Sequence, residues 1–283
     1  MGGEQFVGDK KSEVLDNESV VGKTSEEVEI DSAKPEIEQT DSLTYPDQMD
    51  QAFCSGILDP YEKVKGEGSW AREESAALQR VRDRISFSDG RLIDAGCGMG
   101  RLSLEFAPVF GSVIAVEADE KRIQEAILNA VKSGFENKIE FQNTTIQKME
   151  ASGADMVICS HIIQHVPAET ILEILQKLND SLKSNGILAL STNNSGQSID
   201  KHTKLYWDGS KNIEEDISKE EFGILQGNRD GVLPIHWFSR ASLKQILQDS
   251  GFGVEDVYCY HNLGGNEGED GRDVQIIARK KSI

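Results

Sequence analysis

The chain has 283 residues, of which 37% are hydrophobic, and its 30 basic and 49 acidic side chains give a formal net charge of -19. This length suffices for one domain of catalytic size, and the composition argues against a collagen, a membrane span or a disulfide scaffold. Because nucleic acid phosphates and anionic membrane surfaces repel so acidic a chain, we expect neither as a partner. The sequence leaves the oligomeric state open.

The first 45 residues are rich in Glu, Asp, Ser, Val and Lys and show no sustained helical or strand period. Such a segment buries too little apolar area to offset the entropy of ordering it. We therefore predict a disordered acidic tail over residues 1–45, with a partner-binding arm as the alternative, and a folded domain over residues 46–283.

Helices are expected between residues 46 and 90, where aromatic residues first become frequent. The run SWAREESAALQRVRDRI is the clearest case, because one helical stripe of it carries Trp70, Ala77, Leu78 and Val81. A helix with such an apolar stripe must pack on another element.

Short apolar runs then alternate with helical patterns. Strands are predicted at residues 91–95, 112–117, 138–143, 154–160 and 186–191, and helices at 101–109, 120–133 and 168–183. Several of the strands are apolar almost throughout, which is typical of a parallel sheet covered by helices on both faces.

This rhythm breaks after the fifth strand. Residues 192–237 form a polar insertion, and a helix follows from its cap Ser239 to Leu247. The last apolar runs, 253–260 and 273–279, are joined by a loop without room for a crossover helix, so they should pair antiparallel. The sequence predicts a Rossmann-like α/β fold, a seven-stranded and mostly parallel sheet that ends in an antiparallel hairpin strand.

Three glycines follow the first predicted strand in the stretch LIDAGCGMGRLSLEF. Gly96, Gly98 and Gly100 are spaced one residue more tightly than the glycines of the dinucleotide fingerprint. Asp94 precedes them, and a carboxylate there would repel a diphosphate but suit an ammonium group. Since ligands of open α/β sheets lie beyond the carboxyl ends of the strands, this loop should contact the ligand.

With these residues the sequence resembles the class I S-adenosylmethionine-dependent methyltransferases, in particular small-molecule enzymes like those of methyltransferase type 11. The first motif of that family is an apolar strand that ends in an acid and continues as G-x-G-x-G, which residues 93–100 match. The resemblance covers about residues 70–280 and implies S-adenosyl-L-methionine as the cofactor.

Further motifs follow in the order of the family. Glu117 closes the second strand, where a carboxylate can accept both ribose hydroxyls, and CSHIIQHVP (159–167) resembles the family's fourth strand end. Thr145 takes the place of an Asp that the family often has near the adenine. The cofactor-binding residues implied by the resemblance are Asp94, Gly96, Cys97, Gly98, Gly100, Glu117, Ala118, Thr145, Ile146 and Ser160.

Methyl transfer from a sulfonium requires a positioned nucleophile and, for a hydroxyl or a protonated amine, a base. The candidate bases are His161, His165, His202 and His236, because imidazole titrates near neutral pH. A structural role is the alternative for His165 and His236, and contact with the cofactor or the substrate is the alternative for His161. The insertion (192–237) is expected to be a substrate lid, in which Tyr206 and Trp207 contact the substrate or anchor the insertion.

The resemblance implies methyl transfer to an oxygen, nitrogen or carbon nucleophile of a small-molecule acceptor. The alternatives are a protein N-methyltransferase and a catalytically inactive, cofactor-binding interaction module. The four cysteines (Cys54, Cys97, Cys159 and Cys259) are far apart and form no CxxC pair, so we predict no metal site. Reduced thiols are typical of the cytoplasm, where we expect the protein to be located.

Overall fold

The computed structural model of the protein describes residues 69–86, 89–227, 231–261 and 271–281. The chain divides into two units, Met1–Thr40 and Asp41–Ile283, and all described residues belong to the second unit. The predicted acidic tail and the helices expected before residue 69 lie outside the described residues. Within the described ranges, none of the helices combines the length and the apolar character that crossing a bilayer requires.

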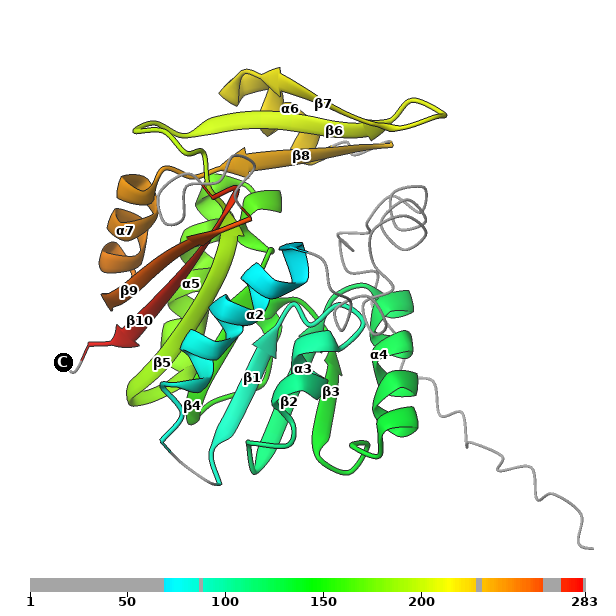
Figure 1. The fold of residues 1–283 in the computed structure, drawn as a ribbon, viewed down its shortest axis with the longest axis vertical. Coiled ribbons are helices and arrows are strands. Elements are labelled where there is room, and N and C mark those ends of the chain that lie inside the picture. Colours follow the sequence, from blue (N-terminus) through cyan, green and yellow to red (C-terminus); the bar gives the residue numbers. More distant parts are fainter. Residues whose placement is uncertain (1–68, 87–88, 228–230, 262–270, 282–283) are drawn as a thin grey trace, which may run out of the picture. The chain divides into compact units, whose positions relative to one another are not determined.

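A seven-stranded sheet forms the core of this unit, in the order β3-β2-β1-β4-β5-β10-β9 (Figure 1). Its strands are β1 (Arg91–Ala95), β2 (Ser112–Glu117), β3 (Ile139–Asn143), β4 (Ala154–Ser160), β5 (Leu182–Asn193), β9 (Phe252–Tyr260) and β10 (Asp273–Lys280). The first five run parallel, whereas β10 pairs antiparallel with both β5 and β9. The predicted fold class, with its antiparallel hairpin, is confirmed.

Helices cover both faces of the sheet (Figure 1). One face carries α2 (Ser69–Arg82), α3 (Arg101–Phe106) and α4 (Glu120–Ser133), and the other carries α5 (Ala168–Ser181) and α7 (Arg240–Asp249). Successive strand residues point to opposite faces, so Leu92 packs with Val81 of α2 while Ile93 packs in the cluster of α5. Burial on both faces explains why the parallel strands are apolar almost throughout.

The residues after β5 form a second, three-stranded antiparallel sheet in the order β7-β6-β8. It consists of β6 (Lys201–Trp207), β7 (Asn212–Ile217) and β8 (Val232–Trp237), with α6 (Lys219–Gly227) between β7 and β8. Figure 1 shows this small sheet beyond the edge at which the parallel strands end. The predicted insertion starts two residues too early, because Thr192 and Asn193 still pair with β10.

Candidate functional site

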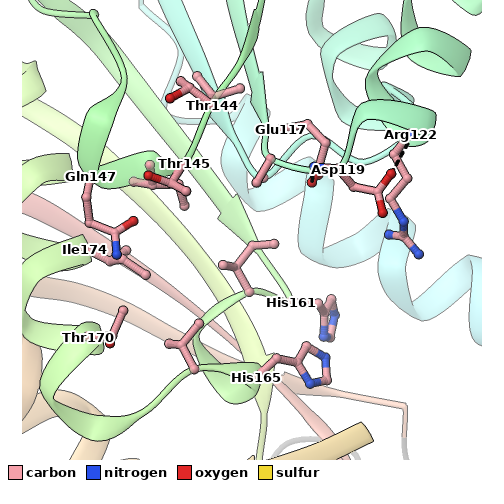
Figure 2. Close-up of a pocket in the computed structure, with 16 residues that line it drawn as sticks. Glu117, Asp119, Arg122, Thr144, Thr145, Gln147, His161, His165, Thr170 and Ile174 are labelled. Carbon is pink, nitrogen blue, oxygen red and sulfur yellow. Dashed lines mark hydrogen bonds between the residues drawn. The ribbon is translucent and has the colours of Figure 1, made fainter. Parts of the chain in front are cut away.

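A pocket opens at the carboxyl ends of β1, β2, β3 and β4 (Figure 2). It encloses about 740 Å³ of empty space, part of which is open to solvent. The end of β2, the loops after these strands and the helices α4 and α5 supply its lining residues, which are Gly96, Val116, Glu117, Ala118, Asp119, Arg122, Thr144, Thr145, Ile146, Gln147, His161, Ile162, His165, Val166, Thr170 and Ile174. This edge is where open α/β sheets bind their ligands.

The loop after β1 requires glycine at two positions. Gly96 has a φ of +80°, and a Cβ there would lie 2.3 Å from Cδ1 of Ile162. Gly100 has a φ of +83°, and its Cβ would lie 3.1 Å from Cβ of Ala126 in α4. Side chains are disfavoured at both positions by conformation and by contact. With any other residue at position 96, the loop after β1 could not lie this close to Ile162 in the loop after β4.

Glu117 connects this loop with the start of α4. Its Oε2 accepts a hydrogen bond from the Gly98 backbone N–H at 2.8 Å, and its Oε1 accepts one from the Asp119 backbone N–H at 3.0 Å. Asp119 in turn caps α4 by accepting from the Arg122 backbone N–H at 3.1 Å. Each oxygen of a carboxylate accepts about two hydrogen bonds, so Glu117 retains acceptor capacity toward the pocket.

Asp94 lies beneath the glycine loop rather than in the lining of this pocket. Its side chain is buried and accepts a hydrogen bond from the Ser103 hydroxyl at 2.6 Å. Burial raises the pKa of Asp94 to about 6, against the opposing effect of the Ser103 hydrogen bond. Its predicted contact with the cofactor stays a prediction, as do those of the other expected residues outside the lining: Cys97, Gly98, Gly100 and Ser160.

The loop after β3 brings Thr145 and Ile146 to the pocket, at the start of the short helix η1 (Ile146–Lys148). Asn143, the last residue of β3, holds the neighbouring loop: its Nδ2 donates to the carbonyl oxygens of Glu117 at 2.9 Å and Ala118 at 3.2 Å. This role of Asn143 could not be predicted from the sequence, because its partners are 25 and 26 residues away.

His161 lines the pocket at the end of β4 in a left-handed conformation, with a φ of +57°. Its backbone N–H donates to the Ser191 carbonyl at 2.8 Å, and its Nδ1 lies 3.2 Å from Nε2 of Gln164. The Gln164 amide is oriented by the Thr192 hydroxyl, which lies 2.9 Å from Oε1. In this orientation the amide donates to Nδ1, so the proton of a neutral His161 is on Nε2.

His165 has the opposite arrangement. It belongs to the short helix η2 (Ile163–His165), and its Nδ1 lies 3.2 Å from the carbonyl oxygen of Pro234. A carbonyl oxygen can only accept, so Nδ1 carries the proton and Nε2 carries the lone pair. Pro234 is a residue of β8, so the small sheet contributes the group that fixes this tautomer. Figure 2 shows both imidazoles among the residues that line the pocket.

His236 lies outside the lining of this pocket. Its ring stacks on those of His202 and Phe238, at centroid distances of 4.5 and 3.9 Å, and its Nε2 lies 2.9 Å from Oδ2 of Asp200. Asp200 also accepts from the Ser239 backbone N–H at 2.7 Å, next to the start of α7. Burial, followed by the proximity of His236, lowers the pKa of His202 to about 4. This cluster joins the small sheet to α7.

Tyr206 and Trp207 also lie outside the pocket lining. The Tyr206 hydroxyl donates to Oε1 of Glu215 at 2.6 Å, and Trp207 is 39% exposed. Their predicted contact with a substrate stays a prediction. The lining instead includes Arg122, Gln147 and Thr170, which the sequence analysis did not identify.

The sequence of this chain is similar to those of known methyltransferases. Residues 70–257 match a family described as a methyltransferase domain. A ubiquinone biosynthesis O-methyltransferase from Xanthomonas euvesicatoria pv. vesicatoria is 31% identical over 118 residues, which are 41% of this chain and 48% of that protein. The chain thus spans about half the length of the curated relatives it matches.

Solved structures share the fold. An S-adenosylmethionine-dependent methyltransferase from Clostridium acetobutylicum has a TM-score of 0.56 at 11% identity, and the match covers 83% of this chain and 99% of that one. Magnesium protoporphyrin IX methyltransferase from Synechocystis PCC 6803 with bound SAH has a TM-score of 0.51 at 18% identity, over 82% and 97%. The family match extends over well more than half of the chain, which therefore belongs to the methyltransferase domain family.

Proposed function

We propose that the protein is an S-adenosylmethionine-dependent methyltransferase that acts on a hydroxyl group of a small-molecule acceptor. The observation that carries the proposal is the convergence of the tight glycine loop, Glu117 and His165 on one pocket at the carboxyl edge of the sheet. The relatives named as O-methyltransferases support oxygen as the methylated atom. Nitrogen and carbon acceptors are the alternatives.

In this proposal Glu117 accepts the ribose hydroxyls with its remaining lone pairs. Ala118, Thr145 and Ile146 enclose the adenine. The methionine part of the cofactor lies along the glycine loop and is bound by Asp94, Gly96, Cys97, Gly98, Gly100 and Ser160. The cofactor supplies a methyl group that its sulfonium has already activated. The task of the protein is to position the acceptor and to remove the proton of the hydroxyl.

His165 is the proposed base. Its Nδ1 donates to Pro234, so Nε2 is the nitrogen that accepts a proton, and the resulting imidazolium stays hydrogen-bonded to the carbonyl. His161 presents an N–H at Nε2 in the observed orientation of Gln164, which suits it to orient an oxygen rather than to deprotonate it. His236, which is stacked in the aromatic cluster, is assigned no part in the reaction.

Transfer of labelled methyl from S-adenosylmethionine to a metabolite extract tests the reaction. Label in the O-methyl group of a small molecule supports the proposal, label on protein bands supports a protein N-methyltransferase, and cofactor binding without transfer supports an inactive interaction module. His165→Ala should lower kcat by about 10²–10⁴-fold while the affinity for S-adenosylhomocysteine stays within about twofold. A His165→Ala enzyme with normal kcat, or a larger loss in His161→Ala, would contradict the assignment.

The lid function of the insertion, which follows β5 and ends with β8, is part of the proposal. Its support is the hydrogen bond between His165 and the carbonyl oxygen of Pro234 in β8. A movement of β8 would remove the acceptor that keeps the proton of His165 on Nδ1. The cytoplasmic location is also part of the proposal. Its support is that Cys97, Cys159 and Cys259, the cysteines in the described residues, are buried thiols rather than members of disulfides.

A further inference from the structure

A second, narrow cavity lies on the other face of the sheet, beneath α2. It has room for about one water-sized group. Apolar side chains line it together with five polar ones: Glu74 of α2, Ser160 of β4, Ser191 of β5, Tyr260 of β9 and Gln275 of β10. Ser160 ends β4, and the next residue, His161, lines the first pocket and bonds to the Ser191 carbonyl at 2.8 Å. The two cavities therefore lie on opposite sides of the same strand ends.

Two of the residues that line this cavity carry a side-chain oxygen without a hydrogen-bond partner in the part of the chain that the structure describes. The two oxygens are Oε2 of Glu74 and Oε1 of Gln275, and the two residues are only 6% and 3% exposed. The other carboxylate oxygen of Glu74 is bonded by Arg101, which directly follows the glycine loop, and the Tyr260 hydroxyl is paired with Ser191. A buried acceptor that stays unpaired destabilises the fold, so two of them in one cavity lining indicate that a water or a ligand group donates to them.

We propose that this cavity is a ligand subsite for a hydrogen-bond-donating group, a hydroxyl or an ammonium, held between Glu74 and Gln275. Only a donor satisfies two acceptors, which excludes carboxylates, phosphates and apolar groups from the position. The subsite rests on the proposed function. Its occupant is either the ammonium of the cofactor or a hydroxyl of the methyl acceptor other than the one that His165 deprotonates.

The test compares the wild-type chain with Gln275→Met, which removes the acceptor and keeps a similar shape, and with Glu74→Gln. The matched control is Asn179→Leu: Asn179 is also buried with an unpaired polar atom, but it lies at the end of α5, next to Gly251 and away from both cavities. Titration calorimetry with S-adenosylhomocysteine probes the ammonium. Saturation-transfer NMR with phenol, on protein saturated with S-adenosylhomocysteine, probes the hydroxyl.

A loss of at least about fivefold in S-adenosylhomocysteine affinity in Gln275→Met, with Asn179→Leu unchanged, assigns the subsite to the cofactor. Unchanged affinity with loss of the phenol signal assigns it to the methyl acceptor. The subsite is refuted if both probes bind Gln275→Met and Glu74→Gln as they bind the wild type, because the cavity then holds only a structural water. If the wild type binds no S-adenosylhomocysteine, this result contradicts both the proposed function and the subsite.

Discussion

Replacing Asp94 by Asn should stabilise the protein in a pH-dependent manner. The pKa of Asp94 is raised from 3.8 to about 6 because the carboxyl is buried. Below the unfolded pKa, both states of the protein hold the proton, and Asp94 does not lower the free energy of unfolding. Between about pH 4 and pH 6 ionisation increasingly disfavours the folded state, and above pH 6 this loss of stability is complete. Two pKa units correspond to about 3 kcal/mol, which is an upper limit for the gain at pH 7.

Asparagine cannot ionise, and its Oδ1 still accepts from Ser103, so the gain should be about 1–3 kcal/mol at pH 7 and close to zero at pH 4. Urea unfolding followed by circular dichroism at several pH values measures it. Asp155→Asn is the control of opposite sign. Partial burial acts to raise the pKa of Asp155, but hydrogen bonds from Lys183 and the Arg91 backbone outweigh this effect and lower the pKa. That variant should lose stability at pH 7. A gain in Asp94→Asn that does not change with pH would refute the reasoning.

Three further predictions concern the loop and the small sheet. Gly96→Ala should lower both the melting temperature and the affinity for S-adenosylhomocysteine, because its Cβ would lie 2.3 Å from Ile162; normal affinity would contradict the loop geometry. Asp200→Ala should lower the free energy of unfolding by about 1–3 kcal/mol at pH 7. Burial acts to raise the pKa of Asp200, but hydrogen bonds from His236 and Ser239 lower it in the folded state, so the loss should be smaller near pH 3, where Asp200 is protonated in the unfolded state and still ionised in the folded state; urea titration tests this. Trp207→Ala, in contrast, should change calorimetric cofactor affinity by less than about twofold, since Trp207 lies outside the pocket lining.

The main sheet could be predicted from the sequence because its signals are local. Apolar runs marked the strands, and the helix predicted at 120–133 has the same bounds in the structure, where Asp119 caps it and Gly134 ends it. The three strands after β5 were missed. The segment Lys201–Trp207, for example, has charged and polar residues at its first four positions although these are partly or fully buried, so its apolar content does not distinguish it from a loop.

The side-chain contacts of the site were the least predictable part, because they join distant positions. Pro234 lies 69 residues from His165, and nothing near His165 in the sequence indicates that a carbonyl will fix its tautomer. Asp94 illustrates the same limit: its position suggested a ligand contact, but the partner that the structure shows is Ser103 in the following helix. Sequence patterns placed these residues at the correct edge of the sheet but did not give their orientation.

Titration calorimetry with S-adenosylhomocysteine and, separately, with NAD tests the central claim most directly, on the wild type and on Glu117→Ala and Glu117→Gln. The account predicts that S-adenosylhomocysteine binds, that NAD does not, and that Glu117→Ala weakens binding by at least about tenfold, with Glu117→Gln between the two. Binding of NAD without S-adenosylhomocysteine, or equal affinity in all three proteins, would contradict it.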